Sequence, residues 1–358
     1  MNQRVTPLLL VCIALGLLNA GCGDSGSNGP LVIDGGIARS TMSLSCPTPG
    51  TLPFTTESTE LQNPSNASAL ELEFDISKDL DVITNPTNDT IVINGRLEFG
   101  TTALDHPINN QRVTDEYVSL WAANGDEWVQ LGRTLTDEDG NYSFDVVGSN
   151  FNPGVTRIYS VFEAAQRCYD HIVSVLEPGT QLIVSDIDGT LTINDGENTQ
   201  QLIDVDYDQK RKVAAVEMIN AWWSKGYYTV LLTARPDSER VITRVWLANH
   251  GFPIDYLQTA GLSIVNGESA RRYKGDFLKR LKNELQLNIV AVYGNAETDI
   301  QAYEDAEIPK AVTFIIGPEA GTYETMAIAD DDYTSHIADY IEAQPTATPP
   351  EGMPAAND

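Results

Sequence analysis

The sequence contains no apolar run of about 20 residues, the length that a helix needs to span a bilayer. Basic residues are scarce, because 22 Lys and Arg stand against 51 Asp and Glu, and the net charge is −29. Phosphate backbones are bound by clustered cations, so we expect no nucleic acid partner. The four histidines lack zinc-like spacing. These absences exclude a multi-pass membrane protein, and a hydrophobic content of 42% fits a globular one.

The pattern of residues 1–21 predicts a secretory signal peptide. Arg4 precedes an apolar run over residues 8–18, and small residues follow. The end of this segment, Leu18-Asn19-Ala20-Gly21-Cys22, resembles the lipobox of bacterial lipoproteins. The resemblance implies secretion across the bacterial inner membrane and lipidation of Cys22. The protein would then be a membrane-anchored lipoprotein in the periplasm or on the cell surface, held stably by its acyl chains. A secreted protein with an unmodified Cys22 is the alternative.

Composition divides the remaining chain into four segments. Residues 22–85 are rich in Gly, Ser, Thr, Pro and Asn and are expected to form a tether and an irregular segment. Residues 86–178 contain short strand-like runs separated by turn residues, which predicts a small all-β sandwich-like domain. Cys46 and Cys168 either pair across these two segments or stay separate thiols. Residues 344–358, with four prolines, predict a disordered tail.

Residues 179–343 show a different pattern, in which apolar runs of strand length alternate with amphipathic stretches. The runs cover 182–184, 227–232, 289–293 and 312–316. One helical face is formed by Val213, Val216, Ile219 and Trp223. Strands that are apolar on both faces and alternate with helices predict an α/β fold, a three-layer Rossmann-like parallel sheet.

Two carboxylates stand at the end of the first predicted strand of this domain, in Asp186-Ile187-Asp188-Gly189-Thr190. In open parallel sheets, ligand sites form at the carboxyl ends of the strands. Neighbouring carboxylates repel each other and need a cation, and Mg²⁺ suits them because it prefers oxygen ligands. Gly189 allows a sharp backbone turn. An aspartate in this place can also attack phosphorus and form an aspartyl-phosphate.

The same residues resemble the first motif of the haloacid dehalogenase superfamily, Asp-x-Asp-Gly-Thr. Three further segments resemble the later motifs of this family in the same order. They are Leu231–Arg235, which ends a strand at a hydroxyl, the segment around Lys274, and Tyr293–Asp299. The resemblance covers residues 181–317. It implies a capless core of this superfamily with Mg²⁺ as cofactor.

The resemblance also implies a role for each residue. Asp186 is expected to be the nucleophile and a metal ligand, and Asp188 the general acid and base, whose backbone carbonyl also binds the metal. Thr233 and Lys274 are expected to hold the phosphoryl oxygens, and Lys274 to offset the carboxylate charge. Asp299 would complete the metal shell, with Asn295 beside it either as a further ligand or as a residue that orients the ligands. The residues expected at the substrate are Gly189, Thr190, Ala234 and Arg235.

A closer resemblance concerns two groups of lipid proteins. Residues 183–192 and 294–303 are similar to the first and fourth motifs of the lipins, which are Mg²⁺-dependent phosphatidate phosphatases. Residues 215–227 and 233–237 look more like the related domain of membrane-associated phosphatidylinositol transfer proteins. The transfer-protein versions usually lack the catalytic aspartate pair and are thought to bind phosphatidic acid without cleaving it. This chain keeps both aspartates, which favours catalysis.

The spacing of the motifs predicts an open site. About 17 residues separate Thr190 from a core helix expected to begin near Asp208, which leaves no room for a large cap. Open sites suit large or membrane-borne phosphoesters, because small substrates usually require lid closure. Six basic residues between Arg271 and Lys282 are either a cationic patch for an anionic lipid surface or a solvated helix face.

These features together predict a Mg²⁺-dependent phosphatase that acts on phosphatidic acid or a related lipid phosphate. Two alternatives stay open. The first is a phosphatidic-acid-binding module that hydrolyses its ligand slowly or not at all. The second is a phosphatase of other large or soluble phosphoesters.

Overall fold

The computed structural model describes residues 54–72, 74–101, 110–124, 127–204, 206–261 and 266–357. The predicted signal peptide, the lipobox at Cys22 and Cys46 lie outside these ranges. Cys168 is disulfide-bonded, and its pairing with Cys46 stays a prediction. No helix within the described ranges is both long and apolar enough to cross a membrane.

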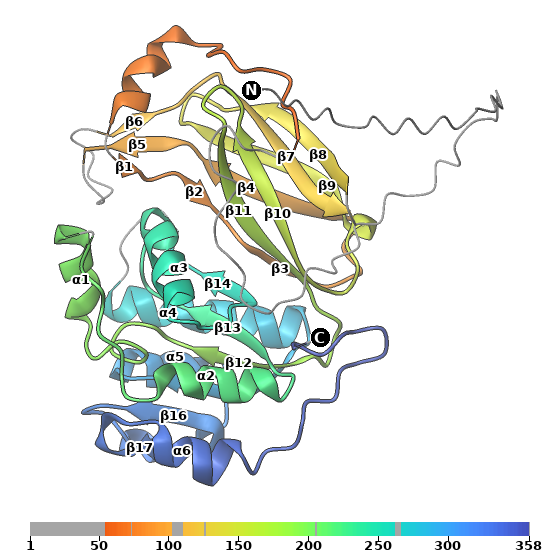
Figure 1. Cartoon of the computed structure of the whole chain (residues 1–358). Helices are drawn as coiled ribbons and strands as arrows, with labels where there is room; N and C mark the ends of the chain where they lie inside the picture. Colours follow the sequence, from red (N-terminus) through yellow and green to blue (C-terminus); the bar gives the residue numbers. More distant parts are fainter. Residues whose placement is uncertain are drawn as a thin grey trace, which may run out of the picture. The chain divides into compact units, whose positions relative to one another are not determined.

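The N-terminal half consists of short strands (Figure 1). Its elements are η1 (Pro64–Glu71), β1 (Phe74–Asp75), β2 (Lys78–Asp79), β3 (Val82–Thr84), β4 (Thr90–Arg96), β5 (Glu98–Gly100), β6 (Gln111–Arg112), β7 (Tyr117–Asn124), β8 (Glu127–Leu135), β9 (Asn141–Val147), η2 (Gly148–Asn150), β10 (Gly154–Phe162) and β11 (Arg167–Val175). Within the described residues they form sheets in the orders β1-β5-β6, β2-β4-β9 and β3-β11-β10-β7-β8. Tyr142, Phe144 and Val146 of β9 are buried and alternate with exposed neighbours, because successive side chains of a strand point to opposite faces. The predicted sandwich-like domain stays a prediction.

The C-terminal half contains a parallel sheet, so the mixed α/β architecture expected from the sequence is confirmed. Its strands are β12 (Gln181–Ser185), β13 (Tyr228–Leu232), β14 (Tyr256–Gln258), β15 (Asn288–Gly294), β16 (Thr313–Ile316) and β17 (Met326–Ile328). Their order is β14-β13-β12-β15-β16-β17, and each neighbouring pair is parallel. Whether this sheet is specifically a haloacid dehalogenase core stays a prediction.

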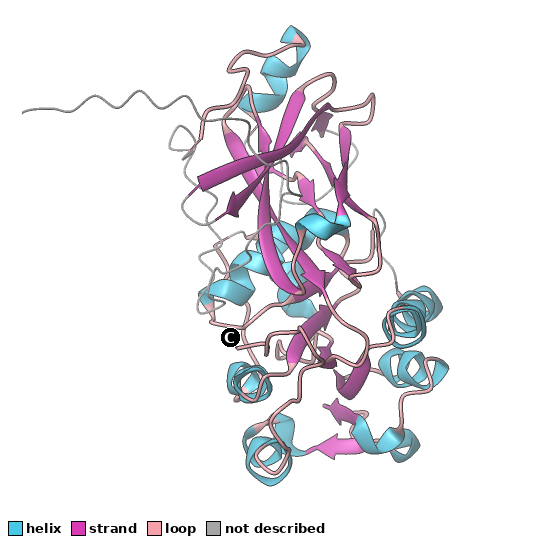
Figure 2. Ribbon diagram, turned by 90° about the vertical axis from the view of Figure 1, so that its right-hand side faces the viewer, coloured by secondary structure: helices cyan, strands magenta, loops and turns pink. Residues whose placement is uncertain are grey.

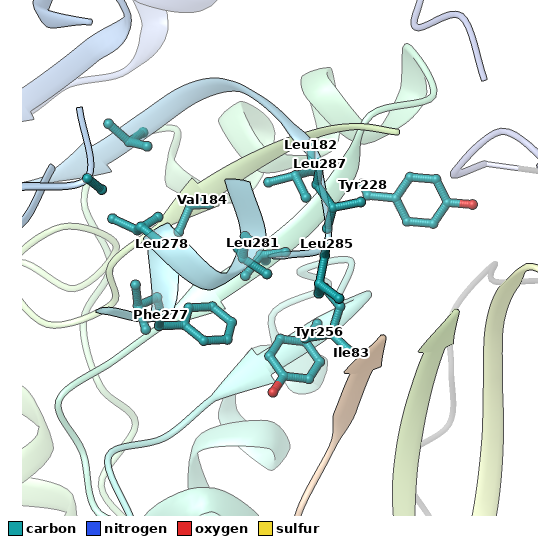
Figure 3. Packing of buried hydrophobic residues seen from close by; sticks show 14 of the residues in the cluster. Ile83, Leu182, Val184, Tyr228, Tyr256, Phe277, Leu278, Leu281, Leu285 and Leu287 are labelled. Carbon is teal, nitrogen blue, oxygen red and sulfur yellow. The ribbon is translucent and has the colours of Figure 1, made fainter. Parts of the chain in front are cut away.

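Helices cover both faces of the parallel sheet (Figure 2). The helices of the C-terminal half are α1 (Gly196–Ile203), α2 (Ala215–Ser224), η3 (Asp237–Glu239), α3 (Arg240–Asn249), α4 (Gly267–Lys279), η4 (Arg280–Glu284), α5 (Glu297–Asp305), η5 (Lys310–Val312), η6 (Thr322–Glu324), η7 (Ala329–Asp331), α6 (Thr334–His336) and η8 (Ile337–Ile341). On one face, Leu182 and Val184 of β12 belong to the same buried apolar cluster as Leu278 of α4, and Figure 3 shows Val184 beside Leu278. Ile183 packs with Trp222 of α2 on the other. A full apolar layer on each face explains why these strands lack alternating polarity.

Helix α4 illustrates how the sequence builds this layer. Asn266 and Ser269 form a capping box at its N-terminus. Phe277, Leu278 and Leu281 then recur at helical spacing and are buried. Each such side chain contributes roughly 1.5–3 kcal/mol when it is fully buried. The helix is therefore fixed against β12, and this position brings its other residues to the carboxyl end of the sheet.

The basic residues around α4 are largely neutralised. Arg271 donates two hydrogen bonds to Asp305 at 2.7 and 2.8 Å, and Lys282 pairs with Glu307. Arg280 donates to the carbonyl of Ile83 at 2.8 Å. These three side chains are thus bound to neighbouring acids and a carbonyl, and the cationic patch for a lipid surface stays a prediction.

The segment after Thr190 differs from the expectation. The sequence predicts only the start of a core helix near Asp208, whereas the structure places α1 in this segment and begins α2 at Ala215. Glu197 of α1 is buried and accepts hydrogen bonds from the Tyr207 hydroxyl at 2.8 Å and the Lys210 amide at 2.7 Å. These polar contacts hold the segment in place. Because they involve no repeating apolar residues, the sequence pattern did not predict α1.

The predicted disordered tail is another difference. Residues 344–357 pack against the segment that leads into β13, where Tyr227 donates to the carbonyl of Pro345 and Tyr228 to that of Pro354. Met353 and Ala356 are buried in the core. Proline lacks an N–H but keeps its carbonyl, so a proline-rich segment can still be held by donors from its neighbours.

A network of buried charges joins the N-terminal strands to α3. Arg240 is fully buried and pairs with Asp79 at 2.7 Å and with Asp81. Arg244 pairs with Asp170 of β11 at 2.6 Å. Burial raises the pKa of Asp79 to about 7, although both arginines oppose this shift. Burial also acts on Asp81, but there Arg240 and Arg244 prevail and lower the pKa.

We expect Arg240→Met to destabilise the protein by about 3–5 kcal/mol, because it leaves buried carboxylates without their main partner. Arg271→Met is the matched control, since Arg271 pairs with partly exposed acids and its loss should cost at most about 1 kcal/mol. Urea unfolding of both variants measures the difference. Equal losses would show that the buried network contributes no more than a surface pair.

Candidate active site

The candidate site lies where three neighbouring strands of the parallel sheet end. β12 lies between β13 and β15, with Ser185 in register with Leu231 on one side and Tyr293 on the other. The residues that follow these strands therefore emerge at one edge of the sheet. The structure brings together Asp186 and Asp188 after β12, Thr233 and Arg235 after β13, and Asn295 after β15.

Lys274 of α4 bridges two carboxylates at this edge. Its Nζ lies 2.6 Å from Oδ1 of Asp186 and 2.7 Å from Oδ1 of Asp299. All three side chains are buried, with exposed fractions of 6% or less. Asp299 also accepts from the amides of Asn295 and Ala296 at the start of α5, where the helix dipole favours an acid. Asp186 and Asp299, distant in sequence, thus share one ammonium group.

The charges of this cluster are unequally balanced. Burial raises the pKa of Asp186 to about 7, and the charges of Asp299 and Asp188 add to the shift, while Lys274 opposes it. Burial alone would lower the pKa of Lys274, but Asp186 and Asp299 raise it above its ordinary value. Lys274 is therefore held as a cation, and burial of the Asp186 carboxylate favours its protonated form.

Asp188 is held by Arg235. The guanidinium donates to both carboxylate oxygens of Asp188, at 2.7 Å from Nη2 and 3.0 Å from Nε. Thr233 donates to Asp188 at 3.2 Å. The remaining donors of Arg235 reach Gln209 at 2.8 Å and Thr243 at 2.9 Å. Arg235 was predicted to contact the substrate, but its guanidinium donates to Asp188, Gln209 and Thr243. Ala234, the other residue predicted there, is partly exposed.

Thr190 and Asn295 make further contacts at this edge. The Thr190 hydroxyl lies 3.0 Å from Oδ2 of Asp186 and 3.3 Å from Oδ1 of Asn295. Asn295 in turn donates to Asp195 at 3.2 Å. Burial raises the pKa of Asp195, and the charges of Asp188 and Asp299 contribute.

Sequence reasoning missed Asp195, Gln209 and Thr243. Asp195 stands a few residues beyond the Asp186–Thr190 segment, and an acid in that place was the available signal. Gln209 and Thr243 carry no signal of their own, because only the fold brings them to Arg235.

The acidic side chains do not form a ready-made metal cage. Within the described ranges, no group of three or more His, Cys, Asp or Glu residues could hold a metal ion. The donor chemistry nevertheless fits a hard divalent cation, because carboxylate and amide oxygens gather at the edge. Asp186 and Asp299 lie close enough to share one ammonium group, so their carboxylates converge at this edge.

The fold and the strand-end site define a class, an α/β protein with a polar site at one edge of a parallel sheet. Comparison with known proteins narrows this class. Residues 183–317 match the family model described as "PITM 1-3, LNS2 domain". The match supports a relationship to the LNS2 family, which is lipin-like and consistent with the haloacid dehalogenase superfamily.

Individual relatives carry related names. The chain is 28% identical to rat membrane-associated phosphatidylinositol transfer protein 1 over 74% of this chain and 20% of that protein. It is 27% identical to human membrane-associated phosphatidylinositol transfer protein 2 over 69% and 17%. It is 26% identical to the Drosophila melanogaster protein retinal degeneration B over 59% and 16%. The chain therefore spans a fifth or less of the length of these relatives.

One solved structure is that of the Pnkp1/Rnl/Hen1 RNA repair complex. The alignment covers 36% of this chain and 40% of the chain in that structure, and the two are 16% identical. Its TM-score of 0.30 is too low to support an inference.

Gly189 tests how tightly the edge is packed. Its φ is +70°, and a Cβ there would collide with the Asn295 amide and the Asp195 carboxylate. Gly251 has a φ of +77° and open space around it. We expect Gly251→Ala to cost roughly 1–2 kcal/mol for the left-handed backbone and Gly189→Ala a further 1–3 kcal/mol or so for crowding. Urea unfolding measures the loss of unfolding free energy in each variant. Equal losses would show that the side chains around Gly189 move aside for a Cβ at no extra cost.

Proposed function

We propose that this protein is a Mg²⁺-dependent phosphatase that acts through an aspartyl-phosphate, with phosphatidic acid or a related lipid phosphate as substrate. The observation that most directly supports this proposal is the buried ion-pair bridge of Asp186, Lys274 and Asp299, with Asp188 at the same edge of the sheet. The names of the relatives support a lipid-related function. The retained aspartate pair favours cleavage over binding alone.

In the proposed reaction, a carboxylate oxygen of Asp186 attacks phosphorus while the bond between phosphorus and the alcohol oxygen breaks. Asp188 gives a proton to the departing alcohol. In the second step Asp188 takes a proton from water as the water oxygen attacks phosphorus, which releases Asp186 and inorganic phosphate. Thr233 would donate to phosphoryl oxygens, and Lys274 would neutralise their charge.

The residues that would hold Mg²⁺ are Asp186, Asp299, Asn295 and the backbone carbonyl of Asp188. When bound, the ion would supply positive charge to the transferred phosphoryl group. The convergence of Asp186 and Asp299 on one ammonium group supports this assignment.

A second candidate function is phosphatidic acid binding without efficient cleavage. Two observations favour it. The relatives are named transfer proteins. In addition, Arg235 donates to both carboxylate oxygens of Asp188, and this two-pronged contact would have to break before Asp188 could carry the proton that a general acid donates. Under this reading the edge would hold a headgroup phosphate through Lys274 and Thr233.

The deciding experiment measures phosphate release from phosphatidate vesicles with Mg²⁺. We expect Asp186→Asn to lower release by about a thousandfold or more, because the nucleophile is lost. Asp305→Asn, an acid-to-amide change on α5 whose carboxylate pairs with Arg271, should leave release unchanged. A soluble panel of glycerol phosphate and p-nitrophenyl phosphate distinguishes a lipid phosphatase from one for other phosphoesters.

Chelation gives an independent check. We expect EDTA to abolish release and added Mg²⁺ to restore it, because the proposed site needs a cation beyond Lys274. Vesicle binding without release in the wild type would favour the binding module. Release that persists in EDTA would contradict the role of the metal.

A further inference from the structure

Helix α3 contacts the N-terminal strands through its two arginines. Arg240 pairs with Asp79 of β2 and with Asp81. Asp81 also accepts from the Ile172 amide of β11 at 2.6 Å and the Leu257 amide of β14 at 3.2 Å. A single buried carboxylate thus ties α3, an N-terminal strand and the edge strand of the parallel sheet to one another.

Arg244 makes the second attachment. Its Nη2 lies 2.6 Å from the carboxylate of Asp170 and its Nη1 2.9 Å from the backbone carbonyl of the same residue. Both arginines and their acids are almost wholly buried. Charges removed from water tolerate little displacement, because a shifted partner leaves an uncompensated ion.

The same helix contacts the candidate site through Thr243. Its hydroxyl accepts from Nη1 of Arg235 at 2.9 Å and donates to the Glu239 carbonyl at 2.7 Å. Arg235 in turn holds both oxygens of Asp188. A continuous series of contacts therefore runs from Asp170 and Asp81 through α3 to Asp188.

We propose that Arg240 and Arg244 are positioning residues for Asp188, and that the N-terminal strands are part of the site's scaffold. The strands hold α3, α3 holds Thr243, and Thr243 orients the guanidinium that holds Asp188. A displacement of about 1 Å in a catalytic group can cost a hundredfold in rate. The geometric part of this inference is independent of the proposed function, and only its catalytic consequence depends on it.

Hydrogen exchange of the full-length protein tests the coupling without requiring activity. The segments to follow are residues 186–192 and 233–239. Arg244→Met removes both contacts to Asp170, and Arg244→Lys keeps the charge but not the two-pronged geometry. Arg133→Met is the control, because Arg133 of β8 pairs with Glu163 and Glu57 and stacks on Tyr117, which all lie outside α3.

We expect Arg244→Met to raise exchange about tenfold in both segments, the size of effect seen along coupled networks. Arg244→Lys should be intermediate, and Arg133→Met should stay within about twofold of the wild type. If Arg244→Met does not fold, Arg244→Lys and Asp170→Asn carry the same test. A rise confined to α3 and the strands, or an equal rise in Arg133→Met, would overturn the inference.

Kinetics separate this inference from the proposed function. If the protein releases phosphate, Arg244→Lys should lower kcat while KM stays near the wild-type value, because Asp188 is misplaced and the substrate is not. An unchanged kcat would overturn the inference. If the wild type releases no phosphate, the proposed function fails, while the exchange pattern still decides whether α3 couples the strands to Asp188.

Discussion

The ammonium of Lys274 between Asp186 and Asp299 is the interaction on which the site depends. Taking three charges out of water costs several kcal/mol per ion, and only close contact offsets that cost. The bridge therefore demands that the end of β12 and the helices α4 and α5 keep fixed positions. The apolar layers on both faces of the sheet provide this rigidity. The geometry of the site therefore depends on the packing of the apolar core.

A second set of buried ion pairs extends the same principle. Arg235 holds Asp188, and the arginines of α3 bind acids in the N-terminal strands. Replacing such pairs by apolar residues is often no worse for stability, so stability alone does not account for them. The relatives carry names of lipid transfer proteins, whereas this chain combines the LNS2 match with two neighbouring aspartates at the strand end. The proposed phosphatase activity therefore rests on the environment of these aspartates.

Much of the fold was predictable because strands that are buried on both faces leave continuous apolar runs in the sequence. The apolar runs at 182–184, 227–232, 289–293 and 312–316 correspond to β12, β13, β15 and β16. The predictions fail where order comes from single polar contacts. Helix α1 is held by Glu197, and the proline-rich C-terminal segment is held by Tyr227 and Tyr228. Contacts of this kind involve one side chain at a time and produce no repeat that a sequence reader can detect.

The amino-acid order is sufficient to specify which chemical groups stand at the strand ends, since strand boundaries and the acids after them are local features. Folding is required to choose their partners. Lys274 is 88 residues from Asp186 and 25 from Asp299, and Arg235 reaches Asp188 across 47. Such pairings depend on how helices pack across the sheet, and periodicity reports which face of an element is buried but not which residue it meets. The charge balance at Asp186, and with it the chemistry of the edge, is therefore a property of the packed molecule.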